Sequence, residues 1–189
     1  MKIRLGRDFF YQPTLTVAKG LLGAELVIDH GGWSRRGRII ETEAYLGLED
    51  QASHAAKGRT TRTAPMFGPA GFTYVYLVYG LHWCLNIVTE AEGYPAAVLL
   101  RALETIDPQS PPRTASGPGK LSRWLGIDST WNRVDVTSNI FYIESNLSQT
   151  NLHIQQGKRI GVDYAGIWAT KPWRFGVTNH PELSQKINH

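Results

Sequence analysis

The chain has 189 residues, of which 42% are hydrophobic and 19% charged, with a formal net charge of +4 and a pI of about 9.3. This composition is that of one globular domain rather than a disordered or coiled-coil protein, and no stretch approaches the ~18 apolar residues of a membrane-spanning helix. The single cysteine, Cys84, excludes a disulfide framework and a cysteine-rich metal site.

The first half of the chain predicts one helix followed by two strands. Residues 14–22 have apolar side chains at helical spacing, and Gly23 can supply the left-handed residue beyond the helix. Residues 24–28 predict a strand, residues 29–32 a turn, and residues 38–45 a second strand. This order is typical of a β-hairpin preceded by a helix.

The second half predicts three more strands and a short helix. The strands are expected at residues 72–78, 83–89 and 97–103. The proline-rich residues 107–119 predict a surface connection, after which Gly117-Pro118 opens a helix that ends before Gly126. We therefore expect a single mixed α/β domain over residues 1–189, with a curved, mostly antiparallel sheet, a protruding β-hairpin and packed helices.

Three stretches of the chain contain basic residues and no acidic ones. They lie between Asp50 and Glu90, between Asp107 and Asp128, and between Asp163 and Glu182. Each alone is typical of solvated surface, but together they favour a nucleic-acid partner. The candidates for phosphate contacts are Lys57, Arg59, Arg62, Lys120 and Lys171.

The strand at residues 38–45, RIIETEAY, places two carboxylates on one face. Because strand side chains alternate, Glu41, Glu43 and Tyr45 share a face. The pattern alone favours a solvated face, and the functional alternative is a general base beside an aromatic wall. Arg101 lies inside the apolar strand VLLRAL and needs a partner. Structurally, it could form an ion pair or snorkel at a sheet edge. Functionally, it could hold a carboxylate and a water in place.

Tyrosines cluster in GFTYVYLVYGLHWCLN, residues 71–86. Tyr74 and Tyr76 share a strand face, and Tyr79 lies at a glycine turn where it can point outward. Such a cluster is usually core, but tyrosine also stacks on bases and can act as a wedge at a protruding tip. His54 is a lone histidine, and no His, Asp or Glu set has metal-ligand spacing, so we expect no metal and no cofactor.

Five blocks of sequence occur in a specific order. They are ETEAY–LG–ED–ASHA at residues 41–55, APMFGPAG–YVYLVYG–HWCLN at 64–86, VLLRALE at 98–104, SGPGKL at 116–121 and RIGVDYAG–WA–KPWRF at 159–175. Together with residues 8–23 they cover almost the whole chain. The set resembles the alkyladenine (3-methyladenine) DNA glycosylase family.

The resemblance implies a role for each matching residue. Glu43 would be the general base that activates water, and Arg101 would help to position that water. The pocket for a flipped base would consist of Tyr45, His54, Tyr76, Asn86 and Val162, with Asn86 disfavouring the 2-amino group of guanine. Tyr79 would insert into the duplex, with Leu81 beside it, where many relatives have methionine. The connection 103–117 is short for the family, and residues 135–158 align poorly.

The expected function is therefore excision of alkylated or deaminated purines from double-stranded DNA by a monomeric, monofunctional enzyme. No lysine lies in the matched motifs near Glu43, so no Schiff base is expected. The alternatives are a non-catalytic nucleic-acid-binding domain and a nucleosidase that acts on free nucleosides. The N-terminus MKIRLGRDFF lacks the apolar core of a signal peptide, so we expect a cytoplasmic protein without a membrane partner, nucleoid-associated in a bacterium or nuclear in a eukaryote.

Overall fold

The computed structural model describes residues 2–146 and 152–187. Its strands are β1 (Lys2–Arg4), β2 (Glu25–His30), β3 (Trp33–Leu46), β4 (Thr73–Val78), β5 (His82–Val88), β6 (Ala96–Thr105), β7 (Phe141–Asn146), β8 (Ile154–Gly157) and β9 (Arg174–Val177). Its α-helices are α1 (Arg7–Phe10), α2 (Thr14–Gly20) and α3 (Pro118–Leu125). Its 3-10 helices are η1 (His54–Lys57), η2 (Ala64–Phe67), η3 (Ser129–Trp131) and η4 (Asp163–Thr170).

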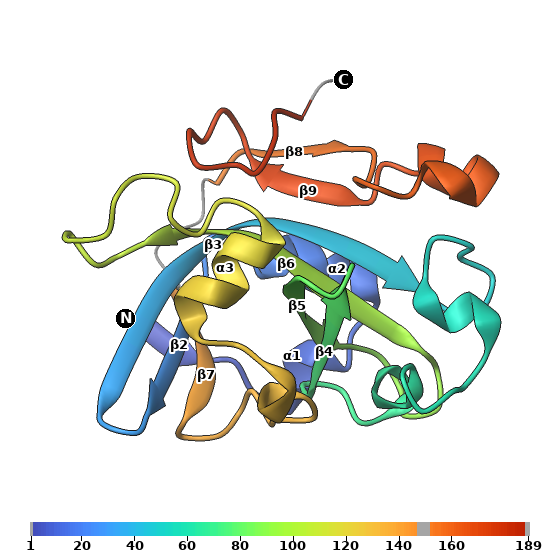
Figure 1. Ribbon diagram of the computed structural model, residues 1–189, viewed down its shortest axis with the longest axis horizontal. Coiled ribbons are helices and arrows are strands. Elements are labelled where there is room, and N and C mark those ends of the chain that lie inside the picture. The colour runs from blue at the N-terminus through green and yellow to red at the C-terminus, as the bar shows by residue number, and fades with distance from the viewer. Residues whose placement is uncertain (1, 147–151, 188–189) are drawn as a thin grey trace.

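One curved antiparallel sheet forms the framework (Figure 1). Its strand order is β1-β7-β2-β3-β6-β5-β4, and β9 pairs with both β3 and β8. The pairings among these strands are antiparallel. The predicted fold class, a mixed α/β domain with a mostly antiparallel sheet, is confirmed.

The predicted elements are present with shifted ends. The turn expected at residues 29–32 is wrong in extent, because Asp29 and His30 continue β2 and only Gly31-Gly32 turn the chain. Both glycines have positive φ, 60° and 81°, as a two-residue hairpin turn requires. The first helix ends at Gly20 rather than at residue 22. The strands β1, β7, β8 and β9 are not among the predicted elements.

Strand β3 is the longest and positions the site. It pairs with β2 through its first half, with β6 through most of its length, and with β9 at Glu41–Glu43. The hydroxyl of Thr42 donates to the carbonyl of Ala18 in α2 (2.9 Å), so Thr42 faces α2. Because alternate residues face opposite sides, Glu41 and Glu43 point away from α2.

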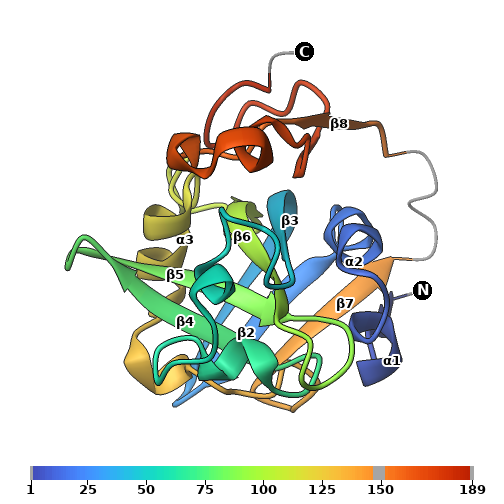
Figure 2. The ribbon, with the colours of Figure 1, turned by 90° about the vertical axis from the view of Figure 1, so that its right-hand side faces the viewer.

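The hairpin β4–β5 projects from the body of the protein (Figure 2). Helix α3 packs against β5 and β6 through its buried Leu121 and Leu125. As predicted, it has Pro118 in its first turn and a left-handed Gly126 (φ 71°) at its end. Among the described residues, no helix has the length and apolar character needed to span a membrane.

Candidate active site

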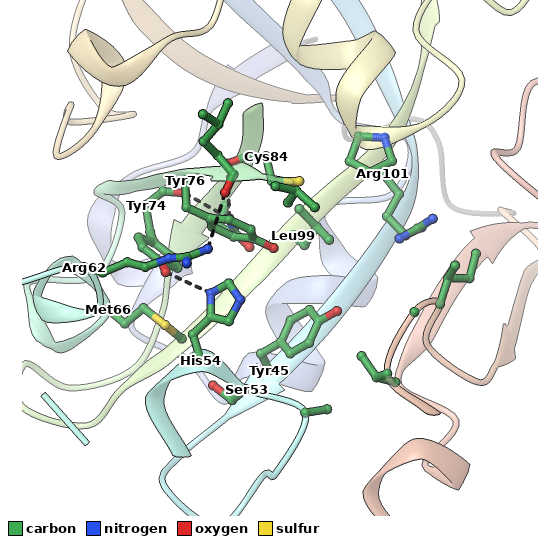
Figure 3. A pocket seen from close by; sticks show the side chains of 18 of the residues that line it. Tyr45, Ser53, His54, Arg62, Met66, Tyr74, Tyr76, Cys84, Leu99 and Arg101 are labelled. Atoms are coloured by element: carbon green, nitrogen blue, oxygen red, sulfur yellow. Dashed lines mark hydrogen bonds between the residues drawn. The ribbon is translucent and has the colours of Figure 1, made fainter. Parts of the chain in front are cut away.

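A cavity of about 540 Å³ lies between the hairpin β4–β5, the segment that carries η1, and the loop between β8 and η4 (Figure 3). The five residues expected to bind a base all line it: Tyr45, His54, Tyr76, Asn86 and Val162. They come from β3, η1, β4, β5 and the loop before η4. The structure therefore brings these five residues together from four strands and helices and one loop.

Aromatic rings form the walls of this cavity. The ring centroids of His54 and Tyr76 are 4.4 Å apart at an interplanar angle of 74°, and Tyr74 lies 5.2 Å from Tyr76. The Nδ1 atom of His54 is 3.0 Å from the hydroxyl oxygen of Tyr74, which fixes the imidazole. Figure 3 shows Tyr45 on the same cavity. Rigid aromatic walls of this kind suit a flat ligand.

His54 is uncharged at neutral pH. Burial, together with the positive charges of Arg62 and Lys57, lowers the pKa of His54 from 6.5 to about 4. The cavity wall therefore carries no positive charge at this position, and a cationic ligand meets no repulsion from the imidazole.

We expect the imidazole of His54 to titrate near pH 4 in the folded protein, against 6.5 for an unperturbed histidine. Between these values the unfolded chain binds a proton that the folded protein does not. This histidine therefore lowers the free energy of unfolding as the pH falls from 6.5 toward 4. An NMR titration, assigned with the variant His54→Gln, measures the midpoint. A midpoint close to that of an unperturbed histidine would contradict the expectation.

The carboxylate of Glu43 lies behind the cavity wall and is fully buried. Its Oε1 accepts a hydrogen bond from the backbone N–H of Ile160 (2.8 Å) and lies 3.2 Å from Nη1 of Arg101. Its Oε2 accepts from the hydroxyl of Tyr45 (2.8 Å). All three donors line the cavity. A carboxylate has about four acceptor positions, so one position on Oε2 is left for another donor.

Tyr45 retains its proton and so remains a donor to Glu43. Burial raises the pKa of Tyr45 well above 10, and the negative charge of Glu43 raises it further. The guanidinium of Arg159 lies 4.7 Å from the centre of the Tyr45 ring and packs against its face. The phenol is thus a fixed neutral donor at the catalytic carboxylate proposed from the sequence.

Arg101 joins both carboxylates of β3. Its Nε is 3.1 Å from Oε1 of Glu41, in addition to the contact with Glu43. Burial opposes the charge on Arg101, but Glu43 and Glu41 outweigh burial and raise its pKa. The interpretation of the Glu41–Glu43 face as solvated is wrong, because both side chains are 0% exposed. Arg101 is buried as well, so it does not snorkel at an edge.

A second buried ion pair supports the site and was not predicted. Nη2 of Arg159 donates to Oδ1 of Asp50 (2.7 Å), and neither side chain is exposed. Nη1 of Arg159 also donates to the carbonyl of Ala44 (2.9 Å). Both residues lie in quoted sequence blocks, but no local pattern connects position 50 to position 159. Neither charge stands out in the sequence, because Asp50 follows Glu49 and Arg159 follows Lys158.

The tip of the β4–β5 hairpin presents two apolar side chains to solvent. Tyr79 is 91% exposed and Leu81 73% exposed. Tyr79 has a φ of 50° and is followed by Gly80 with a φ of 68°, so the chain reverses sharply there. The predicted place of Tyr79 at a protruding tip is confirmed.

The five cations predicted to contact phosphate differ in their surroundings. Lys57, Arg59, Arg62 and Lys120 are exposed, and Arg62 also lines the cavity. Lys171 is partly buried, with Nζ 5.5 Å from the ring of Trp168. Across residues 2–146 and 152–187, no group of three or more His, Cys, Asp or Glu side chains could hold a metal ion.

Comparisons with known proteins show which family the sequence matches. The family model described as "Methylpurine-DNA glycosylase (MPG)" matches residues 8–181. Proteins named "Putative 3-methyladenine DNA glycosylase" are similar along their length. The one from Myxococcus xanthus is 46% identical over 96% of this chain and 93% of its own. The one from Legionella pneumophila (strain Corby) is 48% identical over 96% and 98%, and that from Methanocella arvoryzae is 46% identical over 96% of each chain.

Proposed function

Because this chain belongs to the methylpurine-DNA glycosylase family, and is thus a DNA glycosylase of base excision repair, we propose that it excises alkylated and deaminated purines from duplex DNA. The proposed substrates are the 3-methyladenine, 7-methylguanine, hypoxanthine and etheno-adenine class. One observation supports this most directly: the Glu43 carboxylate is held by three donors that also line an aromatic cavity.

The target base would leave the helix and enter the cavity. Extruding a nucleotide costs a few kcal/mol, and less for a damaged or mispaired base. Stacking on the rings of Tyr45, His54 and Tyr76 can offset this at ~1–3 kcal/mol per base. Alkylated purines are cationic, and the uncharged aromatic rings of the walls favour them through cation–π attraction. The amide of Asn86 donates to the carbonyl of Tyr74 (2.9 Å), so it would form a rigid floor against the 2-amino group of guanine.

Hydrolysis would then use Glu43 as general base. Water attacks C1′ of the deoxyribose, Glu43 takes the water proton, and the purine leaves with the electron pair of the N-glycosidic bond. The same negative charge stabilises the positive charge that develops on the sugar. Since Glu43 has no exposed surface, the water would enter beside the Tyr45 hydroxyl at the remaining acceptor position of Oε2.

Contacts outside the cavity would hold the DNA. Tyr79, with Leu81 beside it, would occupy the space that the base vacates. The cations Lys57, Arg59, Arg62, Lys120 and Lys171 would contact phosphates, and Val162 would line the pocket.

None of the described residues that line the cavity is a lysine. We therefore infer a monofunctional enzyme that leaves an abasic site without cutting the strand. We also propose that it acts as a monomer.

The test is release of base from matched duplexes. Wild-type protein should release 3-methyladenine-type, hypoxanthine or etheno-adenine bases at least tenfold faster than any base of undamaged duplex, and borohydride should trap no adduct. Tyr79→Ala should slow release from a paired lesion more than from a mispaired one, because it loses the wedge. Equal binding of damaged and undamaged DNA without release would support the non-catalytic alternative. Cleavage of free nucleosides alone would support a nucleosidase.

A further inference from the structure

The C-terminal segment that carries Ser184 packs against the buried ion pair of Glu41 and Arg101. The hydroxyl of Ser184 donates to Oε1 of Glu41 (2.8 Å), and its backbone N–H donates to Oε2 of the same carboxylate (2.6 Å). Nε and Nη2 of Arg101 lie 3.4 Å and 3.3 Å from Oγ of Ser184. One hydroxyl thus contacts both the Glu41 carboxylate and the guanidinium of Arg101, whose Nη1 lies 3.2 Å from Oε1 of Glu43.

This segment is anchored on both sides of Ser184. The side chains of Leu183 and Ile187 are buried. The hydroxyl of Ser116 donates to the carbonyl of Leu183 (3.0 Å), and Nη2 of Arg174 donates to the carbonyl of Lys186 (3.0 Å). A hydroxyl presented from backbone fixed in this way can orient its partners at little entropic cost.

The buried charged side chains around Ser184 are two carboxylates and two guanidinium groups. Glu41 and Glu43 are buried with Arg101 and Arg174, and Nη1 of Arg174 lies 3.3 Å from Oε1 of Glu41. Arg101 presents one edge of its planar guanidinium to Glu41 and Ser184, and Nη1 to Glu43. Because the group is rigid, fixing the first edge fixes the direction of Nη1.

We propose that Ser184 is a positioning residue for base excision, which acts on Glu43 through Glu41 and Arg101. The inference rests on the proposed function, since it concerns the rate of the same reaction. Ser184 does not line the cavity, so it contributes to the chemical step rather than to binding of the lesion.

The test separates the chemical step from binding. In Ser184→Ala, the single-turnover rate of excision should fall about tenfold or more, because Arg101 loses one of its fixed contacts. The affinity for duplex with a non-cleavable abasic analogue should stay within twofold of wild type. Ser184→Thr retains the hydroxyl and should recover most of the rate. The matched control is Gln185→Ala, because Gln185 is the exposed neighbour of Ser184. This variant should behave as wild type.

Each outcome decides the proposal. A lower melting temperature for Ser184→Ala with an unchanged rate per folded molecule would mean a purely structural role and overturn it. Equal losses in Ser184→Ala and Ser184→Thr would overturn it as well. If Ser184→Ala does not fold, Ser184→Cys replaces it, and a wild-type rate there counts against the proposal. Absence of excision by the wild-type protein itself would instead refute the proposed function.

Discussion

Replacing Glu43 with glutamine is expected to slow base excision by about 10²–10⁴-fold, the usual contribution of a general base. The amide has the size of the carboxylate, and its oxygen can still accept from the N–H of Ile160 and from Arg101. It has no negative charge, however, to take the water proton or to stabilise the sugar cation. Single-turnover release from a hypoxanthine duplex measures the effect.

Binding should respond differently from chemistry in the same variant. The walls formed by Tyr45, His54 and Tyr76 are unchanged, so the affinity for damaged duplex should stay within a few-fold of wild type. Glu104→Gln is the matched control, because it removes a partly exposed carboxylate of β6 that pairs with Arg38 (2.6 Å). A Glu43→Gln rate within tenfold of wild type would remove Glu43 from the mechanism.

Replacing Asp50 with asparagine is expected to destabilise the protein by about 3–5 kcal/mol, the typical result of removing one partner of a buried ion pair. Arg159 would remain fully buried with its charge uncompensated. For a chain of this size the loss corresponds to a melting temperature lower by roughly 6–20 °C. Thermal unfolding followed by circular dichroism measures it.

The effect of Asp50→Asn should extend to the active site. Arg159 supports the ring of Tyr45, and the next residue, Ile160, donates to Glu43, so a displaced Arg159 would disturb two of the three donors. The control is Glu49→Gln, which neutralises the exposed neighbouring carboxylate. If both variants melt within about 1 °C of wild type, a range typical of neutral surface changes, the pair has no role in stability.

The long-range pairings of the sheet could not be predicted from the sequence. The strands β8 and β9 have four residues each, too few for a periodic pattern to emerge. Strand β9 pairs with β3 at Glu43 and Arg174, so its existence depends on a partner far away in sequence. By contrast, helix α3 is predictable from local sequence, because Pro118 in its first turn and Gly126 just after its last residue mark its two ends.

The sequence by itself determined that Glu41, Glu43 and Tyr45 share a strand face, because side chains alternate along any extended chain. It also determined the turn at Tyr79-Gly80 and, through its ordered blocks, the family. Only the tertiary structure decided that the two carboxylates of this face are buried and charge-balanced. Burial of a carboxylate depends on what packs over it, and here those groups are Arg101, the N–H of Ile160 and Ser184. Their proximity arises from folding of distant segments, which no local pattern encodes.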